Sequence, residues 1–138
     1  MMIETANSSQ INFNSEESFE IEEKFILKIK YNEKLMLFEI EEKNIFPKED
    51  YSIYLSLEEL KKLDKYFLGF ETLKDVHDSL KLRISKKNLS IIKEERKMKI
   101  RLINPINEKE FFINLPLKEK DIKSEINSII PYIASLNE

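Results

Sequence analysis

Six short segments of the chain have the residue pattern of a β-strand, and in most of them apolar residues recur with the two-residue period of a strand that buries one face. The six segments are residues 25–31, 35–40, 51–55, 89–92, 98–102 and 111–117. The short turn Asn32-Glu33 lies between the first two, so we predict a β-hairpin there. The charged run Lys93–Lys97 is predicted to be the tip of a second hairpin, and the chain turns again at Asn104–Asn107.

Between the third and fourth of these segments the apolar period becomes helical. Ser56 and Glu59 form a capping box, which marks a helix start. The apolar residues that follow at helical spacing are Leu57, Leu60, Leu63 and Phe67. We predict that Gly69 ends this helix in the left-handed conformation. Thr72 and Asp75 then begin a second helix. Its predicted core-facing residues are Leu73, Val76, Leu80 and Ile84.

The last predicted element is a helix from Asp121 onward, with apolar residues at alternating steps of four and three. This heptad pattern is typical of a coiled coil, and its apolar seam would be a dimer interface. The seam residues are Ile122, Ile126, Ile129, Ile133 and Leu136. Pro131 and Ile130 leave a second interpretation open, because Pro interrupts helical hydrogen bonding and Ile130 widens the apolar surface. The helix would then pack against its own domain.

These elements indicate a single domain. We assign residues 1–19, rich in Ser, Asn and Glu, to a disordered polar tail, residues 20–120 to a head and residues 121–138 to the C-terminal helix. The predicted fold class is α+β: an antiparallel β-sandwich or barrel-like head, with a two-helix insertion after the third strand and a C-terminal helix that starts a coiled coil. Apolar residues make up 41% of the 138, which suffices for one packed core.

Charge changes this picture mainly by excluding partners. Residues 1–50 contain 6 Lys and Arg against 12 Asp and Glu, and residues 51–138 contain 17 against 14. A nucleic-acid-binding protein usually carries a basic patch, and none is concentrated here. Phe111 and Phe112 adjoin Lys109, but adjacent strand residues face opposite sides, so only one of the two could stack on a base. We therefore expect no nucleic acid partner.

Candidate catalytic chemistry is sparse. The chain has no Cys, which excludes thiol catalysis, and its one Gly cannot form a phosphate-binding loop. His77 is the only His, and we interpret it as a structural residue beside the apolar position Val76. We expect no catalytic residue, no metal and no cofactor. An enzyme would instead need a concave pocket in which carboxylates converge on His77.

The first hairpin carries apolar residues on both faces, which indicates burial on both sides or contact with a partner. The residues of such a head interface would be Ile26, Leu35 and Leu37, with Met98 at the edge of the charged tip. Together with the acidic first third of the chain, this surface would suit a basic partner protein.

The order of elements resembles that of a superfamily of head-plus-coiled-coil scaffolds. The strand at Tyr51–Leu55 enters a helix at Ser56–Leu60, Phe67 and Phe70 surround the next turn, and a heptad pattern follows Lys120. On these features residues 24–138 resemble the centriolar cartwheel protein of the spindle-assembly-abnormal type and the cross-complementing scaffolds of DNA end joining.

The resemblance implies a β-sandwich-like head with helices clamped between its strands, and parallel dimers held together by the C-terminal helix. In the cartwheel relatives a bulky apolar residue at a hairpin tip also joins neighbouring heads. The corresponding tip here, Lys93–Lys97, is charged throughout, so we do not extend ring assembly to this chain.

The sequence therefore predicts a non-enzymatic structural protein that forms homodimers through its C-terminal helix and binds other proteins. By resemblance it would be a scaffold of the cytoskeleton, centriole, basal body or cilium. No apolar run approaches the roughly 18 residues of a membrane span, and residues 1–10 lack the pattern of a secretory signal, so we expect a cytoplasmic protein with no membrane partner. The alternative is a monomeric protein-binding module whose C-terminal helix packs on its own head.

Overall fold

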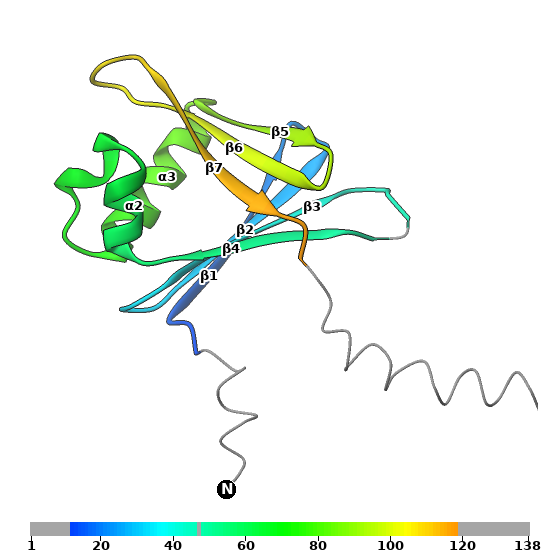
Figure 1. Cartoon of the computed structure of the whole chain (residues 1–138), viewed down its shortest axis with the longest axis horizontal. Helices are drawn as coiled ribbons and strands as arrows, with labels where there is room; N and C mark the ends of the chain where they lie inside the picture. Colours follow the sequence, from blue (N-terminus) through cyan, green and yellow to red (C-terminus); the bar gives the residue numbers. More distant parts are fainter. Residues whose placement is uncertain (1–11, 47, 119–138) are drawn as a thin grey trace, which may run out of the picture.

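The computed structural model describes residues 12–46 and 48–118, and its strands form two antiparallel sheets (Figure 1). The first sheet has the order β1-β2-β3-β4, and the second has the order β5-β6-β7. The bounds are β1 Ser15–Ile21, β2 Phe25–Tyr31, β3 Met36–Glu42, β4 Asp50–Leu55, β5 Leu89–Glu94, β6 Lys97–Ile103 and β7 Glu110–Pro116. All six predicted strands are present at nearly their expected positions, and the α+β class is confirmed.

Strand β1 is the one that the sequence did not predict. Residues 15–19 were assigned to the polar tail, and this assignment is wrong. Only Phe19 and Ile21 are large and apolar in β1, so its own alternation is weak. Pairing with β2 along the whole length of the strand supplies the stability that the pattern lacks. The helices consequently follow the fourth strand, not the third.

Two capped helices connect the sheets, as predicted. The helical segments are α2 Leu57–Leu63, the 3₁₀ helix η1 Lys65–Gly69 and α3 Leu73–Ser85. The Ser56 hydroxyl accepts the Glu59 N–H, and the Glu59 carboxylate accepts the Ser56 N–H, which completes the capping box. Thr72 caps α3 by accepting the Asp75 N–H. Among the residues described, no helix has the length and apolar character needed to cross a membrane.

The first helix is interrupted at Asp64, which its apolar spacing did not predict. Asp64 is extended (φ −158°, ψ 151°), and its carboxylate accepts the Tyr66 N–H at the start of η1. Asp favours such a position because its side chain replaces the missing helical acceptor. Gly69 is the last residue of η1 and does not have a positive φ. The predicted left-handed cap is therefore wrong.

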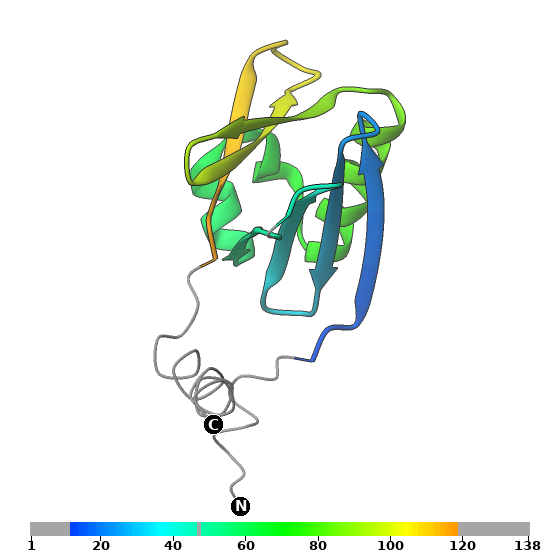
Figure 2. The same ribbon diagram turned by 90° about the vertical axis from the view of Figure 1, so that its right-hand side faces the viewer.

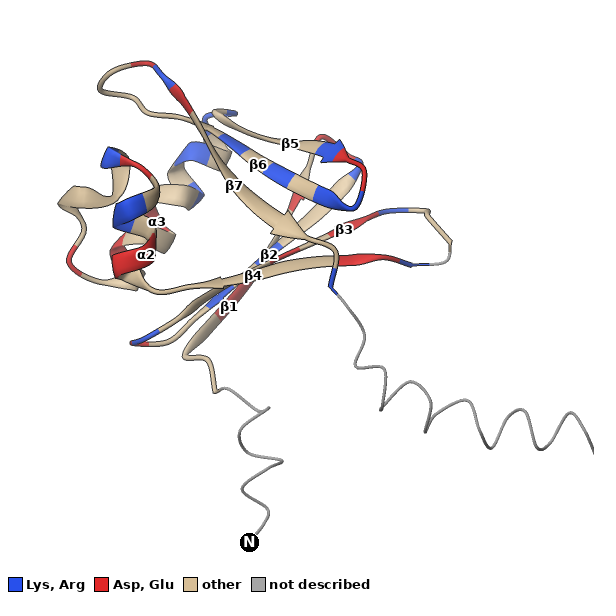
Figure 3. Ribbon diagram, viewed as in Figure 1, with Lys and Arg blue, Asp and Glu red and all other residues tan. Residues whose placement is uncertain are grey.

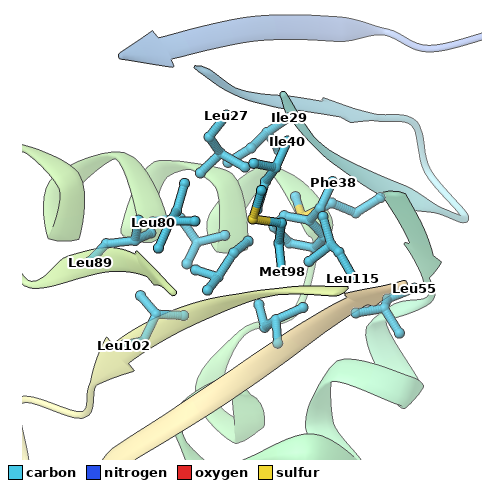
Figure 4. Close-up of a cluster of buried hydrophobic side chains, with 14 of the residues drawn as sticks. Leu27, Ile29, Phe38, Ile40, Leu55, Leu80, Leu89, Met98, Leu102 and Leu115 are labelled. Carbon is cyan, nitrogen blue, oxygen red and sulfur yellow. The ribbon is translucent and has the colours of Figure 1, made fainter. Parts of the chain in front are cut away.

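The core lies between the two sheets, and the helical segments contribute to it (Figure 4). In Figure 4 the first sheet supplies Leu27, Ile29, Phe38 and Ile40, the second supplies Met98, Leu102 and Leu115, and α3 supplies Leu80. The predicted stripe of α3 is confirmed, since Leu73, Val76 and Leu80 are buried and Ile84 packs against the core. Leu60 of α2 and Phe67 of η1 are completely buried as well. Each element therefore places its apolar face against another.

The sheets meet at one edge, and the helices lie between them (Figure 2). At this edge Tyr51 of β4 forms a β-bridge with Leu117, and the Asp50 carbonyl accepts the Lys118 N–H at 2.7 Å. The Leu117 N–H donates to the Arg96 carbonyl, in the β5–β6 turn, at 3.1 Å. The end of β7 is thus tied to both sheets just before residue 119.

Candidate interaction surfaces

The four-stranded sheet turns one face toward solvent, and three of the predicted head-interface residues lie on that side. We call it the outer face of the first sheet. Ile26 is partly exposed and lies opposite Glu41. Leu37 is only 5% exposed, because it sits between neighbouring strands opposite Lys30. Leu35, just before β3, is partly exposed. Ile26 and Leu37 lie toward opposite ends of the hairpin, so they do not form one apolar patch.

Met98 does not belong to any surface of the head. Its exposed fraction is 0%, and it lies in the core between Lys93 and Leu115 on the neighbouring strands. Alternate side chains of β6, which begins at Lys97, point to the same face of the sheet. Met98 therefore points inward, as Ile100 does. The predicted role of Met98 in a head interface is therefore wrong.

Charged side chains dominate the outer face of the first sheet (Figure 3). By strand phase it carries Glu16, Glu20, Glu39, Glu41 and Asp50, against Lys28 and Lys30. The Lys30 ammonium lies 3.4 Å from a carboxylate oxygen of Glu16 and 3.4 Å from one of Glu39. Burial alone would lower the Lys30 pKa, but Glu39 and Glu16 outweigh it and hold that pKa above its ordinary value. Lys43 and Lys48, in the chain between β3 and β4, also pair with Glu20 and Glu41. Five carboxylates thus meet four ammonium groups, which gives this face only a weak preference for a basic partner.

The outer face of the second sheet carries a basic row that is largely neutralised. The row is Lys97, Lys99 and Arg101 on β6. Glu94 lies 3.0 Å from Lys99, and Glu110 lies 2.8 Å from Arg101. The Lys99 ammonium is also 5.3 Å from the centre of the Phe112 ring. Phe111 is buried, so these two aromatics face opposite sides as expected. With its cations paired, the row offers no concentrated attraction for phosphate.

Two hairpin tips expose large apolar residues that were not among the predicted interface residues. Phe46, between β3 and β4, is 96% exposed, and its neighbour Ile45 is also exposed. Ile106, between β6 and β7, is 91% exposed. The sequence does contain a sign of this exposure, because Ile106 is an apolar residue that follows Pro105 inside a predicted turn. The β5–β6 tip is charged, as predicted, with Arg96 at φ 62°.

His77 is buried inside the packing of α3 against the first sheet. It is 5% exposed, and its Nε2 lies 3.1 Å from Glu17 Oε1. Neither ring nitrogen makes a well-directed hydrogen bond within the described structure. The Tyr31 ring lies 5.1 Å away. Lys74 donates to Asp78, the other carboxylate near His77, and lowers the pKa of that carboxyl.

Four surface pockets of about 200 to 610 Å³, formed by residues 12–46 and 48–118, are lined by side chains other than His77, Glu17 and Asp78. The same two ranges contain no cluster of three metal-ligating side chains. The position of His77 fits a packing contact between α3 and β1, which is how the sequence was interpreted.

The predicted dimer seam lies outside the described residues. This applies to Ile122, Ile126, Ile129, Ile133 and Leu136, and to residues 1–11 of the predicted tail. What the structure describes is the point where the chain leaves the head, at Leu117 and Lys118 beside β4. Comparison with known proteins adds no relative, because neither a protein-family model nor a curated protein matches this chain.

Proposed function

We propose that this chain is a structural protein whose α+β head is carried on a C-terminal helix that pairs with a second copy. The observation that carries the proposal is the heptad spacing of residues 122–136, with apolar residues at steps of four, three, four and three. The paired helices would hold two heads at a fixed separation, and the head surfaces would bind other proteins. This is a scaffold's role, and it needs no catalytic group.

The packing of the head supports this role for the C-terminal segment. The inner faces of both sheets pack on one another and on Leu60, Phe67 and Leu80 of the helical segments. The described residues therefore form a core from their own elements. The apolar seam beyond residue 119 is then best satisfied by another helix.

The exit of the chain supports the proposal as well. Three backbone contacts hold it: the Tyr51–Leu117 bridge, the Lys118 to Asp50 bond and the Leu117 to Arg96 bond. A helix that starts from a fixed point can set the orientation of two heads, which a scaffold requires. The resemblance to head-plus-coiled-coil scaffolds supports the same role, although the helices follow the fourth strand and not the third.

The test is the mass of the 138-residue chain by sedimentation equilibrium over a concentration series. We expect reversible association, and its stoichiometry gives the number of paired helices. Ile126→Asp with Ile133→Asp should abolish association, because it places two charges in the seam. Ser128→Asp with Ser135→Asp is the matched control, since it adds the same charge at positions that the heptad places away from the seam.

The melting temperature of the head distinguishes the alternative module. If the C-terminal helix pairs between chains, the Ile126→Asp, Ile133→Asp variant should become monomeric while the head melts as before at high dilution. If the helix packs on its own head, the same variant should lower the melting temperature of a chain that is monomeric throughout. A wild-type monomer at all concentrations would refute the proposed pairing.

A further inference from the structure

A hollow of about 610 Å³ lies between the edge strands of the two sheets. β1 and β5 are terminal strands of their sheets. The hollow is lined by the β1–β2 turn with the end of β1, by the last turn of α3, and by the start of β5. Its lining residues are Glu20, Ile21, Glu22, Glu23, Ile84, Lys87, Leu89 and Ser90. A hollow beside a sheet edge is a setting in which extended peptides can bind as an added strand.

The edge of β5, whose first residues Leu89 and Ser90 line this hollow, presents backbone groups on the side away from β6. The Ile91 N–H points away from β6, because it donates to the Glu22 carboxylate at 3.2 Å. Backbone groups of alternate residues point to the same side of a strand, so the N–H and C=O groups of Leu89 and Lys93 face the same edge. The Glu22 carboxylate therefore occupies one of the backbone hydrogen-bonding positions at which another strand could pair with β5.

The turn that carries Glu22 is conformationally costly. Glu22 and Glu23 have φ values of 56° and 60°, in a region that residues with a Cβ seldom adopt. The turn is closed by the Lys24 N–H, which donates to the Ile21 carbonyl at 3.1 Å. Gly or Asn would adopt this turn at lower cost. The two carboxylates are thus held at the mouth of the hollow by a backbone that does not favour them.

The charge of the lining selects the chemistry of an incoming strand. Three carboxylates line the hollow against one ammonium group, that of Lys87. Lys43 pairs with Glu20 at 2.9 Å, which leaves Glu22 and Glu23 as the carboxylates facing an incoming chain. When a peptide carbonyl accepts the Ile91 N–H, the Glu22 carboxylate is released and requires a cation in its place.

We propose that the β5 edge is a binding site for an extended, basic peptide segment, which pairs with Leu89–Lys93 as an added strand. The peptide carbonyl replaces Glu22 on the Ile91 N–H, and a Lys or Arg of the peptide binds the released Glu22 together with Glu23. Until then, Glu22 shields the edge from unspecific pairing, as charged side chains do on natural edge strands. The site does not depend on pairing of the C-terminal helices.

The probe for the test is a fluorescein-labelled peptide of alternating Lys and Val, titrated into the full chain and followed by anisotropy and by amide shifts in NMR. We expect saturable binding, with the largest shifts at Leu89, Ile91 and Lys93. The same peptide N-methylated at both its Lys and its Val residues keeps its charge but has no backbone N–H for the ladder, so we expect it not to bind. An alternating Glu and Val peptide should not bind either.

Variants of the chain test the role of the carboxylates. Glu23→Lys should weaken the Lys and Val peptide by about fivefold, the scale of an exposed ion pair reversed in sign. Glu33→Lys, at another exposed position just beyond the other end of β2, is the matched control and should bind as the wild type does. Melting curves of both variants show whether the head remains folded.

Three results would overturn the proposal. The first is equal binding of the N-methylated peptide, which would mean attraction by charge alone. The second is the absence of binding, or amide shifts confined to other strands. The third is a change in the Ile91 amide with protein concentration when no peptide is present, because the edge would then pair with a second copy of the chain.

Discussion

Replacing Gly69 with Ala should stabilise the head, although Gly69 is the only glycine of the chain and the last residue of η1. Gly69 lies at the end of η1 without a positive φ, and a Cβ built on it would meet no atom within 4 Å. Ala at such a position lowers the entropy of the unfolded chain and stabilises by about 0.4–1 kcal/mol. For a domain of this size that is a rise of roughly 2–8 °C in melting temperature.

The assay is thermal and urea unfolding of Gly69→Ala and Gly69→Asn beside the wild type. If Gly69 has the conformation described, the Gly69→Ala protein should be the most stable of the three, because Asn favours turns over regular structure. A left-handed Gly69 would give the opposite order, with Gly first and Ala last, since Asn tolerates that region better than Ala. A lower melting temperature for Gly69→Ala would therefore refute the conformation assigned to η1.

Three further substitutions test other parts of the head. Arg83 is 8% exposed and its Nε has no hydrogen-bond partner in the described structure, so Arg83→Met should keep the packing of the stem and raise the free energy of unfolding by about 1 kcal/mol in urea titrations. Ser56→Ala removes the capping box with Glu59 and should lower the same free energy by about 1 kcal/mol. The Arg101 hydrogen bond lowers the pKa of the Glu110 carboxyl, so Arg101→Gln should return that pKa to its ordinary value in an NMR titration. Because the pKa is lowered in the folded state, this pair stabilises the head above the ordinary carboxyl pKa and loses its effect as the pH falls through the folded value.

Strands with a complete alternation could be predicted from the sequence, and β1 shows the limit of that method. In β2 or β6 the apolar residues themselves report the buried face. In β1 one inward position is Glu17, whose carboxylate lies 3.0 Å from the Lys81 ammonium and 3.1 Å from His77. A polar residue that faces inward toward partners on a distant helix breaks the pattern, and only the folded structure supplies those partners.

The helix pair shows a second limit: the spacing of apolar residues does not reveal where a helix is interrupted. Leu57, Leu60 and Leu63 fit one helix that could continue to Phe67. The break comes from Asp64, whose side chain caps the next segment and ends α2 at the same time. Asp is compatible with a helix and with a cap, so local sequence leaves the choice open.

Residues of the candidate surfaces were predictable only in part, for a geometric reason. Met98 and Leu37 are both apolar strand residues near polar neighbours, and both are buried. Their burial depends on strand phase and on which side chains flank them across the sheet. Phe46 and Ile106 are exposed because they occupy loops, where no phase applies. Exposure of apolar side chains is thus a property of position in the fold.

The ties at the end of β7 also determine how the head would carry a mechanical load. A pull on the chain beyond Lys118 acts first on the bond to Asp50, in one sheet, and on the bond from Leu117 to Arg96, in the other. Force along β7 then shears its ladder with β6, in which Pro116 lies opposite Lys97 and Glu110 lies opposite Ile103. Many bonds share the load in shear, whereas a pull across the strand opens them one by one. The head would therefore resist tension best along the axis of β7.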